Sequence, residues 1–146
     1  MAERTVFQSM SNKHVVRVPP QASIRDAACV MSKANCGSVL VMEPPDTILG
    51  ILTERDLMTR VLAKGLDADG TAVRDVMTPK PICVLPETPV SEAVVIMIER
   101  GFRHLPVVTA QQRVLGVFSV RDALPREINS ALDLAEFNEQ VNDALG

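Results

Sequence analysis

Residues 50–56 read GILTERD, and residues 116–122 read GVFSVRD. Both stretches consist of a glycine, two apolar residues, a hydroxyl residue, two variable residues and an aspartate. The two stretches are 66 residues apart, and the same shift aligns residues 17–56 with residues 83–122 without a gap. Nine of the 40 aligned pairs are identical. Chance agreement at ordinary composition would give about two or three pairs. We therefore interpret the chain as a duplicated unit whose copies are related by a pseudo-twofold axis.

Each copy predicts the element order β-α-β-β-α. Apolar residues spaced three and four apart, such as Ile24, Ala27 and Met31, predict one buried face of a helix. We expect Ser23 and Thr88 to be the N-caps of the two equivalent helices. The β-rich runs that predict strands are residues 15–18, 38–42, 48–52, 82–85, 104–108 and 114–118.

The two copies are expected to differ after their hairpins. In the first copy a helix is predicted from about Glu54 to Ala63, ending near Gly65. In the second copy Pro125 removes an amide donor and should stop or kink the helix. Beyond it, the apolar residues Leu134, Phe137, Val141 and Leu145 keep helical spacing in an acidic background. They predict a final amphipathic helix that packs on the domain or on a partner.

The predicted fold class is α+β, with two repeats and a C-terminal helix. The expected boundaries are residues 5–63 for the first repeat and 74–125 for the second. Residues 64–73, which are rich in Gly and Asp, are expected to be the linker, and residues 126–146 the helical extension.

Composition excludes several classes of protein. A net charge of −3 disfavours binding to nucleic acid, and a chain with no Trp or Tyr has few aromatic side chains for stacking bases. The apolar runs are too short to span a bilayer, and the N-terminus does not resemble a signal peptide. The three cysteines have no C-x-x-C spacing, so we expect buried thiols and a reducing, cytoplasmic location.

The hydroxyl and aspartate of each motif allow two interpretations. In the first, the hydroxyl caps a free amide at a helix start and the carboxylate meets the positive end of the helix dipole. In the second, the amides and the hydroxyl meet a phosphate while the carboxylate accepts both hydroxyls of a ribose. Two such motifs facing each other would frame a nucleotide cleft.

The chain resembles a tandem pair of CBS domains. The resemblance rests on both motifs, on VMTPKP at residues 76–81 and on FRHLPVV at residues 102–108, and it covers about residues 5–125. It implies a Bateman module, in which two CBS motifs pack together and many members bind AMP, ADP, ATP or S-adenosylmethionine in the cleft between them. Such modules regulate a partner protein and often form homodimers.

The resemblance also implies which residues bind the ligand. Two hydroxyl–carboxylate pairs are expected to contact ribose, basic residues the phosphates, and three further residues the adenine end. The ribose pairs are Thr53 with Asp56 and Ser119 with Asp122. The basic residues at the phosphates are Arg103 and His104, and the residues at the adenine end are Thr78, Lys80 and Ile82. Gly37 and Ser38 replace the basic pair in the first copy, so we expect unequal sites and one occupied cleft.

No catalytic motif and no metal-ligand cluster is recognisable in the sequence. We therefore expect a protein that is not an enzyme and has no covalent cofactor. One hypothesis is a sensor that binds an adenosine nucleotide, AMP, ADP or ATP in preference to S-adenosylmethionine, and modulates a partner. The alternative is a ligand-free module for dimerisation and protein interaction. Replacing Asp56 and Asp122 distinguishes the two, because only the sensor loses ligand binding.

Overall fold

The computed structural model describes residues 3–145, which form two compact units. The first, here called the 14–82 unit, consists of residues 14–82 with residues 112–114. The second, the 83–145 unit, consists of residues 3–13, 83–111 and 115–145. Residues 64–73, expected as a linker, lie inside the 14–82 unit. The predicted repeat boundaries are defined by sequence similarity, whereas the two units are defined by contacts in space. The units therefore do not test those boundaries, which stay a prediction.

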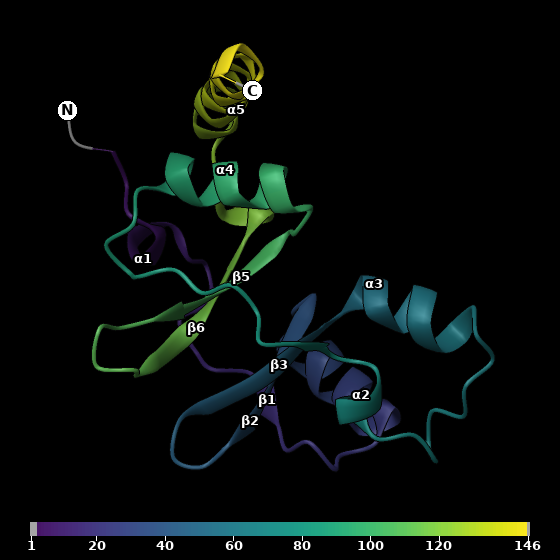
Figure 1. Cartoon of the computed structure of the whole chain (residues 1–146). Coiled ribbons are helices and arrows are strands. Elements are labelled where there is room, and N and C mark those ends of the chain that lie inside the picture. The colour runs from purple at the N-terminus through teal and green to yellow at the C-terminus, as the bar shows by residue number, and fades with distance from the viewer. Residues whose placement is uncertain (1–2, 146) are drawn as a thin grey trace. The chain divides into compact units, whose positions relative to one another are not determined.

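The 14–82 unit is built around a four-stranded sheet of order β1-β2-β3-β4 (Figure 1). β1 pairs parallel with β2, and the β2-β3 and β3-β4 pairs are antiparallel. Its strands are β1 (Arg17–Val18), β2 (Ser38–Glu43), β3 (Thr47–Thr53) and β4 (Thr78–Pro79). Its helices are α2 (Ile24–Ala34), α3 (Glu54–Asp56), the π-helical η1 (Leu57–Leu62) and the 3-10 turn η2 (Val73–Asp75).

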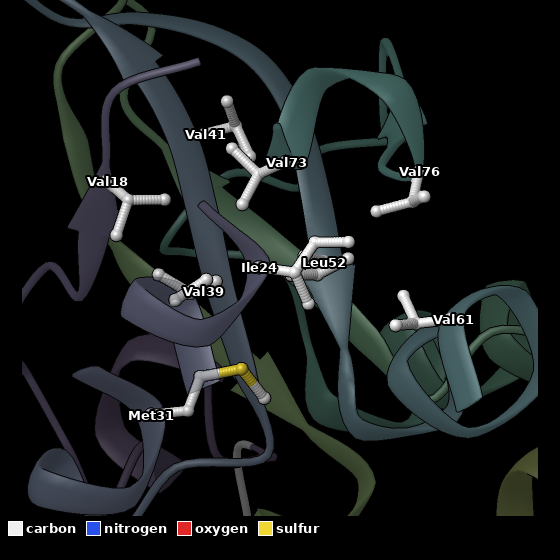
Figure 2. Close-up of a cluster of buried hydrophobic side chains, with 10 residues drawn as sticks. Val18, Ile24, Met31, Val39, Val41, Leu52, Val61, Val73 and Val76 are labelled. Carbon is white, nitrogen blue, oxygen red and sulfur yellow. The ribbon is translucent and has the colours of Figure 1, made fainter. Parts of the chain in front are cut away.

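The core of the 14–82 unit is aliphatic. Side chains from β1, α2, β2, β3, η1 and η2 gather in one cluster (Figure 2). Its members are Val18, Ile24, Ala27, Met31, Val39, Val41, Leu52, Val61, Val73 and Val76. Burial of this apolar surface drives the packing, since each fully buried aliphatic side chain contributes about 1.5–3 kcal/mol.

The 83–145 unit contains the pair of strands β5 and β6 together with the helices α4 and α5 (Figure 1). α5 packs against α4, and α1 also contacts α4. Its elements are α1 (Val6–Ser9), α4 (Val90–Arg100), β5 (His104–Val108), β6 (Val114–Ser119), the 3-10 turn η3 (Val120–Asp122) and α5 (Pro125–Leu145). Phe118 and Leu105 are fully buried in it, as is Val6 from the N-terminal segment.

Backbone pairing confirms the duplication. Val18 pairs in parallel with Val41, and Val84 forms a parallel bridge with Val107, which are the same two positions shifted by 66 residues. In the second copy this bridge replaces the strand expected at residues 82–85. The predicted hairpin strands agree with β2, β3, β5 and β6 to within about one residue.

A second set of bridges shows that the repeat continues with a shift of one residue. Thr5 bridges Pro89, and Ala72 bridges Ser23. Pro89 and Ser23 are 66 positions apart, whereas Ala72 and Thr5 are 67 apart. The hydrogen bonds Val6 N–H to Thr88 O and Val73 N–H to Ala22 O have the same offset. Residues 71–78 therefore pair with the start of α2 in the 14–82 unit in the same way as residues 4–11 pair with the start of α4 in the 83–145 unit.

Two predicted helix ends agree with the structure, and two predictions are wrong. Ser23 caps α2 by accepting a hydrogen bond from the Asp26 amide, and the helix after the first hairpin ends at Leu62 with Ala63 as its C-cap. Thr88 is not the N-cap of α4, because Pro89 holds that position and no side chain caps it. Pro125 does not interrupt a helix: η3 ends at Asp122, and the proline is the first residue of α5, where its missing amide costs nothing.

The cysteines differ from expectation. Cys29 and Cys83 are exposed and Cys36 is half-buried, and none of the three forms a disulfide. Met31 and Met97, at equivalent positions of α2 and α4, are buried as expected for flexible core side chains.

Candidate functional site

The Thr53–Asp56 pair lies where β3 passes into α3. The Thr53 Oγ1 atom accepts a hydrogen bond from the Asp56 amide at 3.3 Å. In return, the Oδ2 atom of Asp56 accepts from the Thr53 amide at 2.9 Å and from the Thr53 hydroxyl at 3.1 Å. The Oδ1 atom lies 3.6 Å from Arg60 Nε. The turn is therefore a capping box, and the Asp56 residue is 8% exposed.

The Ser119–Asp122 pair repeats this arrangement where β6 passes into η3. The Oδ2 atom of Asp122 accepts from the Ser119 amide at 3.0 Å, and Ser119 Oγ accepts from the Arg121 amide at 3.3 Å. The Oδ1 atom of Asp122 accepts two hydrogen bonds from Ser11, one from its hydroxyl at 2.6 Å and one from its amide at 3.3 Å. Sequence reasoning identified both aspartates but missed Ser11.

Both turns confirm the helix-cap interpretation of the motif. The cap uses the Oδ2 atom of each aspartate, and an ionised carboxylate has about four lone-pair positions for hydrogen bonds. Capping therefore leaves acceptor capacity at the Oδ1 atoms. The two interpretations of the motif are compatible, because one oxygen holds the turn and the other is directed elsewhere.

Arg103 and His104 lie beside the second turn. His104 begins β5 and is half-buried, and Arg103 is exposed. The Arg103 carbonyl accepts a hydrogen bond from the Val120 amide at 3.0 Å. In the 14–82 unit the equivalent bond joins the Glu54 amide to the Gly37 carbonyl at 3.0 Å. The structure thus preserves the backbone position in both copies, but only the 83–145 unit has a cationic side chain there.

Thr78, Lys80 and Ile82 lie at the edge of the four-stranded sheet. Thr78 pairs with Ile51, and the Lys80 amide donates to the Leu49 carbonyl at 3.1 Å. Ile82 is half-buried. Lys80 has a positive φ of 47°, which is uncommon for a residue with a side chain and marks a sharp turn. These residues share the 14–82 unit with Thr53 and Asp56, but Thr78 forms no hydrogen bond with Asp56 among residues 3–145.

A cavity of about 440 Å³ opens beside Lys80 in the 14–82 unit. Arg74 and Lys80 provide two cationic groups at its wall, and Glu43 provides one carboxylate. The other lining residues are apolar or proline: Pro20, Ile48, Leu49, Met77 and Pro79. A cavity of this composition suits a ligand with an apolar ring and a negative group. The contact expected between Lys80 and the adenine end of a ligand stays a prediction.

An ion pair ties the N-terminal segment to the second turn. Arg4 Nη2 donates to the Asp122 carbonyl at 3.1 Å and to Glu127 Oε1 at 2.7 Å. The Arg4 hydrogen bond is the main cause that lowers the pKa of Glu127 below its ordinary value, against an opposing effect of burial. Residues 4–11 therefore contact the Asp122 turn through two separate side chains, Arg4 and Ser11.

No helix of residues 3–145 is both long and apolar enough to cross a membrane. The same residues contain no group of three or more His, Cys, Asp or Glu side chains placed to hold a metal ion.

Comparison with known proteins reveals related chains. The family model for the CBS domain matches residues 7–63 and 73–127. A protein of Methanopyrus kandleri, named MK0525 and described as uncharacterized, is 31% identical over 118 residues, which cover 81% of this chain and 60% of that protein. This chain therefore spans less than two thirds of that relative's length.

Two solved structures are similar to most of this chain. A CBS domain protein of Pyrobaculum aerophilum, PAE2072, was solved in complex with AMP. It superimposes with a TM-score of 0.77 and 29% identity, covering 91% of this chain and 99% of its own. A hexameric CBS-CP12 protein from bloom-forming cyanobacteria has a TM-score of 0.75 and 26% identity, covering 82% of this chain and 66% of its own.

Proposed function

Because this chain belongs to the CBS domain family and contains two CBS domains, we propose that it is a regulatory module that binds an adenosine nucleotide. Binding of AMP, ADP or ATP would modulate a partner protein. The proposal is for a binding module and not for an enzyme. Its ligand is a reversible regulator, with no covalent cofactor involved.

The observation that carries the proposal is the pair of equivalent carboxylates. Asp56 and Asp122 are each held by a cap through Oδ2, which fixes the direction of the Oδ1 atom. A fixed carboxylate oxygen is suited to accept hydrogen bonds from the two hydroxyls of a ribose. The related Pyrobaculum protein was solved with AMP, a ligand that carries such a ribose.

The cationic groups favour a phosphorylated ligand. Arg103 and His104 would meet phosphates in the 83–145 unit, and Lys80 with Arg74 would attract a negative group in the 14–82 unit. S-adenosylmethionine carries a positive charge on its sulfonium and lacks phosphates, so these groups disfavour it relative to AMP, ADP or ATP. Thr78 and Ile82 would line the adenine end of the ligand.

Regulation requires two states of the module with different affinities for the nucleotide. A ligand that binds both states equally shifts no equilibrium, however tightly it binds. We propose that the nucleotide favours one state and that a partner protein, located with it in the cytoplasm, distinguishes the two.

A second function is supported by the C-terminal helix. Four apolar side chains of α5 are exposed by roughly two fifths or more: Leu134, Phe137, Val141 and Leu145. An apolar stripe of this kind is typical of a protein-contact surface. The alternative is therefore a ligand-free interaction module that forms homodimers, with the two aspartates acting only as caps.

Thermal unfolding with nucleotides distinguishes the two functions. The purified chain is melted with AMP, ADP, ATP or S-adenosylmethionine at a hundredfold excess over the dissociation constant. Binding then adds about 2.7 kcal/mol, which raises the midpoint by roughly 5–10 °C. The Asp56→Asn/Asp122→Asn variant should lose this increase. An Asp133→Asn variant, altered on the exposed part of α5, is the matched control and should keep it.

The readout is the ligand-induced increase in each variant, because loss of a cap by itself lowers the midpoint. An increase with a phosphorylated nucleotide that disappears only in the double variant supports the sensor. If none of the four compounds raises the midpoint of the unaltered protein, the sensor is rejected and the interaction module takes its place.

A further inference from the structure

The contact between Ser11 and Asp122 occupies the oxygen that the proposed function assigns to a ribose. Ser11 donates to Oδ1 twice, from its hydroxyl at 2.6 Å and from its amide at 3.3 Å. Ser119 occupies Oδ2. Three of the roughly four acceptor positions of this carboxylate are therefore filled by the chain itself. Ser11 is exposed, so the contact lies where a dissolved ligand can compete for it.

The equivalent carboxylate in the other unit is not occupied in this way. Within residues 3–145, Oδ1 of Asp56 accepts no hydrogen bond, and its close polar neighbour is Arg60 Nε at 3.6 Å. The offset of 67 residues between the two edge segments makes Thr78 the counterpart of Ser11. Thr78 has a hydroxyl, yet that hydroxyl makes no hydrogen bond to Asp56.

We propose that Ser11 is an internal competitor of the nucleotide ribose at Asp122, and that it makes the two halves of the module unequal in affinity. This inference rests on the proposed function and deepens it. The Asp56 half accepts a ribose without losing an existing hydrogen bond at Oδ1. The Asp122 half must first release the Ser11 hydroxyl. Its cationic neighbours, Arg103 and His104, strengthen phosphate binding there, and Ser11 opposes that advantage.

The size of the effect follows from the bond that the ligand displaces. A hydrogen bond to a charged group is strong enough for its removal to change a binding constant by roughly tenfold or more. Replacing Ser11 by alanine removes the hydroxyl and leaves the weaker amide contact. We therefore expect AMP to bind the Asp122 half about tenfold more tightly in Ser11→Ala, with no change in the Asp56 half.

The test measures AMP binding by titration calorimetry in single-site backgrounds. Asp56→Asn leaves the Asp122 half, and Asp122→Asn leaves the Asp56 half. Ser11→Ala is introduced into each background. Ser11→Thr keeps a hydroxyl at the same position and should retain the original affinity. Ser130→Ala, on the exposed surface of α5, is a matched control for loss of a serine hydroxyl. Thermal melts without AMP check that each variant is folded.

Three outcomes are distinguishable. Tighter AMP binding by Ser11→Ala in the Asp56→Asn background alone supports the inference. Equal or weaker binding in that background overturns it, while AMP binding by the same variants still supports the proposed function. If neither the unaltered protein nor any variant binds AMP, the proposed function and the inference fail together.

Discussion

Glycine 50 illustrates how closely two segments approach at the sheet edge. A Cβ atom at this position would overlap with Met77 Sδ and would lie 2.7 Å from the Thr78 carbonyl oxygen. The carbonyl belongs to β4, which pairs with β3 at this position, so it cannot move without breaking the pairing. The glycine that begins the GILTERD stretch is therefore required because there is no room for a larger side chain. It also lies beside Thr78, one of the residues expected to bind the ligand.

Gly50→Ala is expected to destabilise the protein by roughly 1–3 kcal/mol, the usual cost of forcing an extra carbon into a packed site. Urea denaturation at neutral pH measures this change. The matched control is Gly70→Ala, whose new Cβ would lie 2.8 Å from the Asp67 Oδ2 atom, the end of a flexible side chain. If both variants lose equal stability, the close approach of β4 is not the cause.

At the residue scale, the sequence predicted hydrogen bonds between residues that are close in the chain and missed those between residues that are far apart. The capping geometry of Thr53 and Ser119 follows from a spacing of three residues, so it was predictable. Ser11 is 111 positions away from Asp122, and a lone serine has no local signal. One indirect signal exists, since an alignment that allows a one-residue gap before residue 17 matches Ser11 with Thr78. The exposure of Cys29 and Cys83 was mispredicted because composition does not specify whether a thiol on a helix or in a loop faces the core or the solvent.

At the element scale, the start of α5 is defined by charge as well as by Pro125. Glu127 lies in the first turn, where a carboxylate is favourable, and its side chain is only 6% exposed. It accepts from Arg4 and from the Leu124 amide at 2.7 Å. The helix therefore begins at a fixed point and is joined to the N-terminal segment there.

Glu127→Gln is expected to lower the free energy of unfolding by about 1–2 kcal/mol at pH 7, because it removes a charge-assisted contact. The folded-state pKa of Glu127 lies below its ordinary value of 4.5. Its stabilisation is therefore present above that value and is lost as pH falls through the lower, folded-state pKa. The difference between the unaltered protein and the variant should shrink below about pH 4.5.

Urea denaturation between pH 3 and pH 7 measures this dependence. Glu136→Gln, on the exposed part of α5, is the control and should follow the unaltered protein across the range. A difference for Glu127→Gln that stays constant down to pH 3 would show that the ion pair with Arg4 does not cause it.

The elements were largely predictable because hydrophobic periodicity is a local property. β2, β3, β5, β6 and α2 follow from their alternation or helical spacing. The failure at Thr88 has a tertiary cause: the Thr88 carbonyl accepts from the Val6 amide, and the chain passes into α4 through Pro89. No pattern within residues 82–90 indicates that a segment from the N-terminus pairs there.

At the scale of the whole molecule, the N-terminal segment belongs to the unit of the second repeat. Val6 and Met10 are buried among residues of the 83–145 unit, to 0% and 4% exposure. The equivalent residues of the 14–82 unit, such as Val73, come from the chain between the repeats. Of the two aligned stretches, residues 17–56 are therefore completed by the segment that precedes residues 83–122, and residues 83–122 by the segment that precedes residues 17–56.

Val6→Ala is expected to loosen the 83–145 unit, at a cost of roughly 1–3 kcal/mol for a buried aliphatic truncation. Hydrogen exchange should increase in β5 and β6 and stay unchanged in β2 and β3. Val18→Ala, in the core of the 14–82 unit, should give the reverse pattern. Equal increases in all four strands after Val6→Ala would contradict the assignment of residues 3–13 to the 83–145 unit.

The placement of residues 3–13 in the 83–145 unit also sets the order in which the two units can fold during synthesis. The chain leaves the ribosome from its N-terminus, and domains generally fold as units as they emerge. Apart from residues 112–114, the 14–82 unit is one continuous stretch, so it can form as soon as Ile82 is clear of the exit tunnel. Residues 3–13 are synthesised before the 14–82 unit, whereas the other segments of the 83–145 unit, including α4, β5 and most of β6, are synthesised after residue 82. Residues 3–13 therefore have no packing partners while the 14–82 unit forms, and the apolar side chains of Val6 and Met10 stay exposed to water until α4 has been synthesised.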